Sequence, residues 1–209
     1  MDQLQKYNVL KTSAFTVLAL VAFAANSVLA RMALGDGAID ASGFTVIRLL
    51  SGAVMLVIIS AVVGRRSGAA KNSGRLSGSL KGGSWLGAVM LFVYAISFSF
   101  AYISLDTGTG ALILFGAVQF TMIAVSLISG NRPGLGEWTG LVLAFSGFVY
   151  LVLPGISTPS ALGFGLMTIS GIAWGFYTLN GRGSANPLAD TTSNFVLCGW
   201  LPFCKLFLK

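Results

Sequence analysis

Long apolar blocks separated by short polar segments dominate the sequence. Each block is about 20 residues long, which at 1.5 Å rise per residue matches the ~30 Å hydrocarbon core of a bilayer. Because the blocks are continuously apolar and do not alternate with a period of two, the pattern predicts transmembrane helices and not membrane strands. The predicted spans cover residues 13–33, 44–63, 85–105, 111–128, 137–153, 161–179 and, with a less regular pattern, 191–208.

The composition supports a membrane environment. Hydrophobic residues make up 55% of the chain and charged residues 9%, whereas soluble domains are about 25% charged. The mean hydropathy is +0.84. Lys6 and Lys11 before the first apolar run also fit a cleaved signal peptide, but the run continues to Leu34 and further spans follow, so we expect a retained first helix.

The basic residues predict the orientation of the chain. The largest basic cluster lies between the second and third spans, within residues 65–81, and the positive-inside rule places such a loop in the cytoplasm. The N-terminus and the loops of Arg132 and Arg182 then also lie inside, while Asp40 and Asp106 lie outside. We therefore expect a multi-pass protein of the plasma (inner) membrane whose N-terminus is cytoplasmic.

Charge and residue content exclude several other functions. The formal charge is +7, but the basic residues lie between apolar blocks and do not form the polar surface that nucleic acid requires. The chain has no histidine, and Cys198 and Cys204 lie in one apolar stretch, so zinc chemistry and a disulfide framework are not expected. A Ser–His protease and a carboxylate metal site are excluded in the same way, and we predict a protein that is not an enzyme and needs no cofactor.

Pairs of glycines four residues apart recur along the chain, and those at 83–87, 136–140 and 171–175 lie in or beside the predicted spans. This spacing puts both glycines on one helical face, where they allow helices to approach closely. We read all three as packing sites and not as substrate contacts.

Several segments resemble the helices of one transporter family. The segments AANSVLAR and GFTVIRLLSGA look like its first two helices, and GTGALILF, GNRP, EWTGLVLAFSG and YLVLPG look like its fourth and fifth. They occupy residues 24–31, 43–53, 108–115, 130–133, 137–147 and 150–155. Their order and spacing identify the chain, up to about residue 190, as similar to the EamA family of the drug/metabolite transporter superfamily.

The resemblance implies ten helices in two inverted five-helix repeats, with the substrate near the membrane midplane where the repeats meet. It implies a complete first repeat in residues 1–155 and an incomplete second repeat of about two helices in 156–209, hence a C-terminally truncated chain. Residues 26–31 parallel residues 177–182, each segment having an arginine five positions after a polar residue. The chain departs from the family at Asn131, where a Glu is usual, and near Gln119, where a Pro is usual.

Polar side chains inside a span are costly and are the default site candidates. Asn26 is predicted either to bind a substrate amine or carboxylate or to hydrogen-bond a neighbouring helix. Arg48 is predicted either to attract anions or to pair with Asp40 or Asp106 near the outer face. Gln119 is a third candidate.

Aromatic residues with polar tips complete the predicted substrate site, since their rings supply apolar contact and their hydroxyl or indole groups supply orientation. A membrane-interface belt is the alternative reading, and it fits Trp85 and Trp138 at helix ends. The four aromatic candidates are Tyr94, Tyr102, Trp174 and Tyr177.

The acidic residues offer no candidate for proton coupling. No Asp, Glu or His lies in the middle of a span, and Glu137 opens the fifth helix, where a carboxylate favours the helix dipole. A neutral or zwitterionic metabolite, such as an amino acid, is the expected substrate of an exporter or permease working by alternating access in the lipid bilayer. The alternative is an inactive truncated remnant or a membrane assembly partner, and a homodimer is one way for a single repeat to complete a central site.

Overall fold

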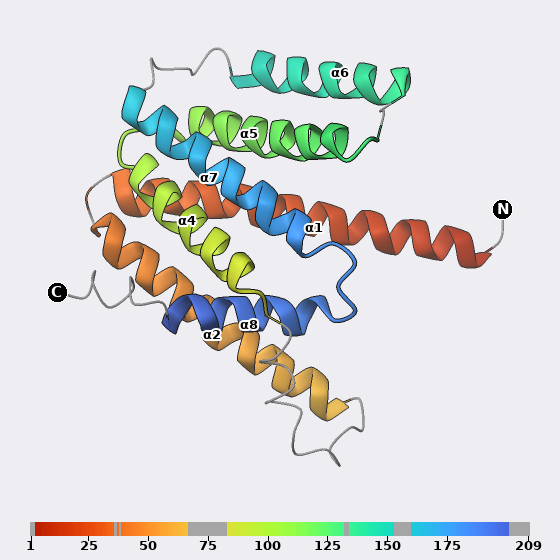
Figure 1. The fold of residues 1–209 in the computed structure, drawn as a ribbon, viewed down its shortest axis with the longest axis horizontal. Coiled ribbons are helices and arrows are strands. Elements are labelled where there is room, and N and C mark those ends of the chain that lie inside the picture. The colour runs from red at the N-terminus through yellow and green to blue at the C-terminus, as the bar shows by residue number, and fades with distance from the viewer. Residues whose placement is uncertain are drawn as a thin grey trace.

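The computed structural model describes residues 3–35, 37, 39–66, 83–131, 134–152 and 160–200, and these residues form helices joined by turns, without a strand among them (Figure 1). The helices are α1 (Gln3–Gly35), α2 (Ala41–Arg66), α4 (Trp85–Ala101), α5 (Thr107–Ile128), α6 (Leu135–Val152), α7 (Ala161–Asn180) and α8 (Pro187–Trp200). The prediction of an all-α protein is confirmed over this part of the chain. The repeat boundaries at residues 155 and 156 fall between described segments and stay a prediction.

Within the described segments, four helices are long and apolar enough to cross a membrane: Val9–Gly35 in α1, Ala41–Gly64 in α2, and α5 and α7 along their full lengths. Many of their large apolar side chains point outward; Ile128, for example, is 86% exposed. A helical membrane protein accounts for this, because lipid covers such surfaces. The shorter α4 has 17 residues and ends at Ala101, where span 85–105 was predicted to continue.

Helix α4 is the centre of the bundle. It packs most extensively on α7 and also contacts α8 and α2, while α7 packs in turn on α5 (Figure 1). Small residues make this possible: Ala88, Ala95 and Ser99 of α4 are almost completely buried. The core therefore forms where helix backbones approach closely, as expected for membrane bundles.

Two of the three glycine pairs confirm the packing prediction. A Cβ on Gly171 would lie 2.6 Å from the carbonyl oxygen of Leu114 in α5, and a Cβ on Gly87 would lie 2.8 Å from the amide nitrogen of Asn194 in α8. The third pair does not follow the prediction, since a Cβ on Gly136 or Gly140 of α6 meets nothing within 4 Å. These two glycines lie on an outer helix, so their spacing serves no contact with the described residues.

Helix α6 lies at the edge of the bundle, and α1 crosses the middle of the view with its N-terminal part extending beyond the other helices (Figure 1). The main contacts of α1 are with α5 and α2, and the main contact of α6 is with α5. Glu137 accepts a hydrogen bond from the N–H of Gly134 at 3.0 Å, so it serves the start of α6 as predicted, although α6 begins two residues earlier at Leu135. At the start of α7, Ser160 Oγ accepts from the N–H of Gly163 at 3.1 Å.

Many hydroxyl groups of the helices are satisfied within their own helix. Each of a set of Ser and Thr side chains donates to the carbonyl four residues earlier, at 2.7–2.9 Å, so no second helix is needed to satisfy it. The set is Thr16, Thr45, Ser99, Thr121, Thr168, Thr178 and Thr192.

Candidate functional site

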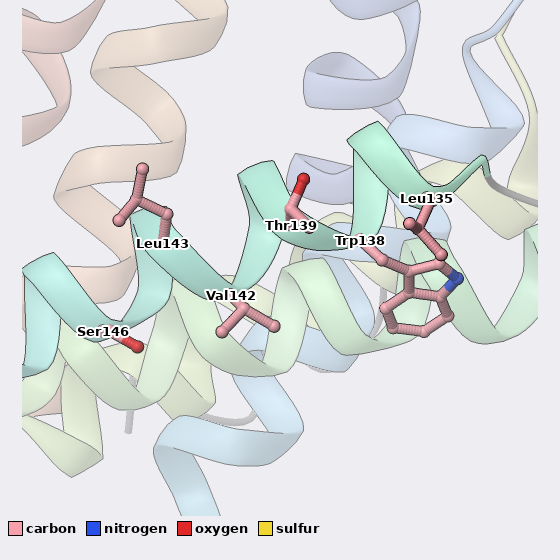
Figure 2. Close-up of a pocket in the computed structure, with 6 residues that line it drawn as sticks. All are labelled: Leu135, Trp138, Thr139, Val142, Leu143 and Ser146. Carbon is pink, nitrogen blue, oxygen red and sulfur yellow. The ribbon is translucent and has the colours of Figure 1, made fainter.

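A groove of about 400 Å³ on the outside of the molecule is a poor candidate for a polar ligand. Its described lining consists of side chains of α6, with Trp138 and Leu143 among them (Figure 2). Apart from the hydroxyls of Thr139 and Ser146 and the indole N–H, its lining is apolar. A site for a polar metabolite needs several convergent polar groups, so the interior of the bundle is the better place to look.

Arg48 reaches from α2 into the bundle. Its Nη2 donates a hydrogen bond to the hydroxyl of Tyr94 in α4 at 2.7 Å, and its Cζ lies 4.6 Å from the ring centre of Phe98. Such cation–π contacts are worth about 0.5–2 kcal/mol. The other terminal guanidinium nitrogen, Nη1, is buried and has no hydrogen-bond partner among the described residues.

The predicted pairing of Arg48 with Asp40 or Asp106 is wrong. The Asp40 carboxylate instead accepts hydrogen bonds from the Ser42 hydroxyl and, at 2.8 Å, from the N–H of Gly43, at the start of α2. These two bonds lower the pKa of the exposed Asp40 carboxyl. Asp106 pairs with Arg31. The two carboxylates therefore serve other groups, and Arg48 turns inward.

An aromatic cluster links α4 to α7. The Tyr94 and Trp174 ring centres lie 4.6 Å apart, and Trp174 stacks on Tyr177 at 5.3 Å with an interplanar angle of 30°. Phe98 continues the cluster toward Tyr102, with ring centres 4.7 Å apart. Ring pairs of this kind contribute about 0.5–1.5 kcal/mol beyond their buried area. The structure thus brings all four predicted aromatic residues into one cluster with Arg48.

A small cavity lies beside this cluster, between α1, α4, α5 and α7. Asn26, Tyr94 and Trp174, all predicted site residues, line it together with Phe23 and further side chains. Its volume is about 10 Å³, which is at the lower limit for a single water molecule. The site is therefore closed in this conformation, and a ligand larger than water would require the surrounding helices to move.

Tyr102 is completely buried at the end of α4. Its hydroxyl forms no well-aligned hydrogen bond within the described part of the chain, and the Ser27 side chain of α1 lies beside it as a hydrogen-bonding neighbour. Gly110 of α5 makes room for the ring, because a Cβ there would lie 2.6 Å from Tyr102 Cε1. The end of α4 thus places a buried hydroxyl near the aromatic cluster, with α5 making room for its ring.

Gln119 does not belong to this site. It is exposed on α5, while Leu114 and Thr121 form the buried face of that helix. Gln119 follows Leu114 by five positions, so the two side chains differ by a rotation of about 140° around a helix of 3.6 residues per turn. The rotation of α5 therefore turns Gln119 away from the cavity that it was predicted to line.

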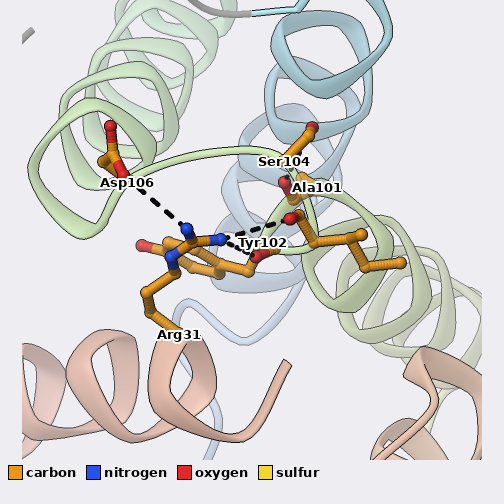
Figure 3. Close-up of polar contacts among 6 residues, drawn as sticks. Arg31, Ala101, Tyr102, Ser104 and Asp106 are labelled. Atoms are coloured by element: carbon orange, nitrogen blue, oxygen red, sulfur yellow. Dashed lines mark hydrogen bonds and ion pairs between the residues drawn. The ribbon is translucent and has the colours of Figure 1, made fainter. Parts of the chain in front are cut away.

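Arg31 is a functional candidate that sequence reasoning passed over. Its Nη1 donates to the carbonyl oxygens of Tyr102 and Ile103 at 2.9 and 3.2 Å, and its Nη2 lies 3.7 Å from Asp106 Oδ1 (Figure 3). These contacts connect α1 to the turn between α4 and α5. The available signal was its place at the end of an apolar helix, where an arginine can bind the last carbonyls of a neighbouring helix.

Comparison with protein-family models gives no match for the chain. The chain is similar to protein PA1977 of Pseudomonas aeruginosa. The two are 48% identical over 198 residues, which are 95% of this chain and 64% of PA1977. The chain thus spans about two thirds of the length of PA1977.

PA1977 is itself described as uncharacterized, so its name assigns no activity to this chain. The similarity covers nearly all the described helices, including α1, α4 and α7, which form the closed site. PA1977 is therefore a longer relative suited to comparative experiments on this site.

Proposed function

We propose that the chain forms part of a permeation pathway for a small metabolite, in a permease or exporter that works by alternating access. The observation that carries this proposal is the inward cluster of Arg48, Tyr94 and Trp174, with Asn26 on the adjoining cavity. These residues come from α1, α2, α4 and α7. Polar side chains in membrane helices are costly and mark substrate pathways by default.

The resemblance to the EamA family supports the same proposal. It implies a second, inverted set of helices, and the greater length of PA1977 leaves room for additional helices in that relative. In this proposal the protein lies in the plasma membrane with a cytoplasmic N-terminus, and the expected substrates are small metabolites such as amino acids.

A closed cavity fits one stage of an alternating-access cycle. Opening would separate α1 from α4 and α7, because these helices contribute Asn26, Tyr94 and Trp174 to the cavity wall. The hydrogen bonds of Arg31 to the end of α4 hold α1 in place, so they would have to break or shift during opening.

The alternative is a membrane protein without transport activity of its own. One observation favours it: the cavity of about 10 Å³ is too small for any metabolite. The two hypotheses differ in whether purified protein supports flux.

Flux into proteoliposomes tests the proposal. This chain and full-length PA1977 would each be reconstituted and supplied with a panel of radiolabelled amino acids. We expect saturable uptake that Asn26→Ala and Trp174→Ala each reduce by about tenfold, the loss of roughly one hydrogen bond or ring contact. Gln119→Ala is the matched control, because it removes a membrane-helix amide outside the site.

Equal effects of Asn26→Ala and Gln119→Ala would contradict the assignment of the site. Flux by PA1977 but not by this chain would favour the alternative.

A further inference from the structure

The strongest unexplained feature of the structure is the buried guanidinium nitrogen Nη1 of Arg48, which has no hydrogen-bond partner among the residues that the structure describes. An arginine in a membrane helix usually extends its side chain to the membrane interface, where water hydrogen-bonds the guanidinium group. Arg48 does not do so, since Nη1 is enclosed while Nη2 is held by the Tyr94 hydroxyl inside the bundle. Arg48 as a whole is half-buried, and a charge that is partly removed from water without a counter-ion is stabilised when an opposite charge joins it.

The protein itself supplies no such counter-ion from its described residues. Asp106 is paired with Arg31, and Asp40 is bound by Ser42 and Gly43 at the start of its own helix. The contacts of Arg48 are a neutral hydroxyl and two aromatic rings. The positive charge is therefore positioned but not neutralised.

A second buried donor lies on the same cluster. Among the described residues, the Tyr102 hydroxyl is buried without a well-aligned hydrogen bond, with Ser27 beside it, and the Tyr102 ring packs on Phe98, which also lies 4.6 Å from the Arg48 guanidinium carbon. The hydroxyl and the guanidinium can both donate to an acceptor. A negatively charged oxygen acceptor, such as a carboxylate, suits both donors.

We propose that Arg48 binds the carboxylate of a small organic acid, with Tyr102 as a second donor and the rings of Tyr94 and Trp174 against the apolar part of the ligand. This inference rests on the proposed function and assigns its substrate class. It assigns to Arg48 the preference for a carboxylate over an amide or an amine. When an amide or an amine occupies a site built for a carboxylate, the buried donors of the site lose their acceptor.

Binding of benzoate to the purified full-length chain in detergent tests the inference. Benzoate has a ring and a carboxylate, while benzamide and benzylamine match its shape without the negative charge. We expect saturable binding of radiolabelled benzoate, at least tenfold tighter than that of benzamide or benzylamine measured by competition. Replacement by Arg48→Gln should weaken benzoate binding on the order of tenfold to a hundredfold and change benzamide binding little.

Two further variants separate charge loss from misfolding. Arg48→Lys keeps the charge but loses the fork, so we expect an intermediate loss of benzoate affinity. Arg182→Gln removes the same charge at an exposed turn outside the site, and it should leave benzoate affinity unchanged. Size-exclusion chromatography and circular dichroism would identify any variant that fails to fold, and the Arg48→Lys result then decides.

Several results would overturn the inference: no saturable benzoate binding, equal affinity for benzoate and benzamide, or full benzoate affinity in a folded Arg48→Gln or Arg48→Lys variant. The two proposals fail separately. Flux of a neutral metabolite without benzoate binding would overturn the carboxylate site and leave transport standing. Benzoate binding without flux of any carboxylate or amino acid in proteoliposomes would support the site and contradict transport.

Discussion

Substituting Gly171 by alanine should disrupt the contact between α5 and α7. A Cβ at this position would lie 2.6 Å from the Leu114 carbonyl oxygen and 2.6 Å from Ala117 Cβ. Ordinary contacts of this kind are about 3.5–4.0 Å long, so the helices would have to separate by roughly 1 Å. The backbone carbonyl cannot rotate away as a flexible side chain would, and the strain therefore spreads along the interface.

The expected cost follows from two opposing terms. Overpacking of a close-packed interior costs about 1–3 kcal/mol, while replacing a helical glycine by alanine gains up to about 1 kcal/mol of helix propensity. We expect Gly171→Ala to lower the free energy of unfolding by about 1–2 kcal/mol. The matched control is Gly140→Ala in α6, where the new Cβ meets nothing within 4 Å and only the propensity gain remains.

The measurement is reversible unfolding in mixed micelles, with increasing dodecyl sulfate and circular dichroism as the readout. The two alanine variants should differ by about 2 kcal/mol, with Gly171→Ala below the wild type and Gly140→Ala at or slightly above it. Adding Ala117→Gly to Gly171→Ala should restore part of the stability but not all, since the Leu114 carbonyl remains. Equal stabilities of the two single variants would refute the reasoning.

Four further predictions concern the helix ends and the orientation. Replacing Arg31 by glutamine should lower the unfolding free energy by about 1–2 kcal/mol, because its hydrogen bonds to the carbonyl groups are lost. Asp106→Asn should lower it by less than about 1 kcal/mol, because the ion pair is half exposed. Equal losses would assign the effect to the ion pair instead. Ser160→Ala should lower the unfolding free energy by about 1 kcal/mol through loss of the cap of α7, measured in the same titration. Hydrogen bonds lower the pKa of Asp40 below 3.8, so the stability that Asp40 adds is complete above pH 3.8 and is lost as the pH falls through the lowered pKa. The stability advantage of wild type over Asp40→Ala should therefore shrink in acid unfolding curves, and a constant difference would contradict this. A phosphatase fusion in the loop 65–81 should be inactive in a bacterial host and a fluorescent-protein fusion there should be bright, as expected for a cytoplasmic loop; the opposite pattern would reverse the predicted topology.

The helices themselves could be predicted from the sequence because apolar runs of about 20 residues have one stable form in lipid. The packing of Gly171 was also predictable, since the spacing of two glycines sets a flat helical face. The rotation of each helix was not. Helix α5 is apolar on nearly all sides, so no polar stripe shows which face is buried, and the exposed position of Gln119 could not be read from the sequence.

The partners of charged residues could not be predicted from the sequence for a different reason. Asp40 immediately precedes α2 and Arg48 follows it by eight positions, which made a pairing near the outer face plausible. The long arginine side chain instead crosses to Tyr94 of α4, and only the packing of α2 against α4 brings those groups together. Similarly, Arg31 acquires its role from a turn more than 70 residues away in the chain.

The hydroxyls that bond back to their own helix have a practical consequence for mapping the pathway. Thr121, Thr168 and Thr178 present mostly a methyl group to their surroundings, because the donor proton is already committed to a backbone oxygen. A scan that ranks positions by side-chain polarity would spend most of its effort on such residues and record silent substitutions. Amide and guanidinium positions such as Asn26 and Arg48 are the more economical places to begin.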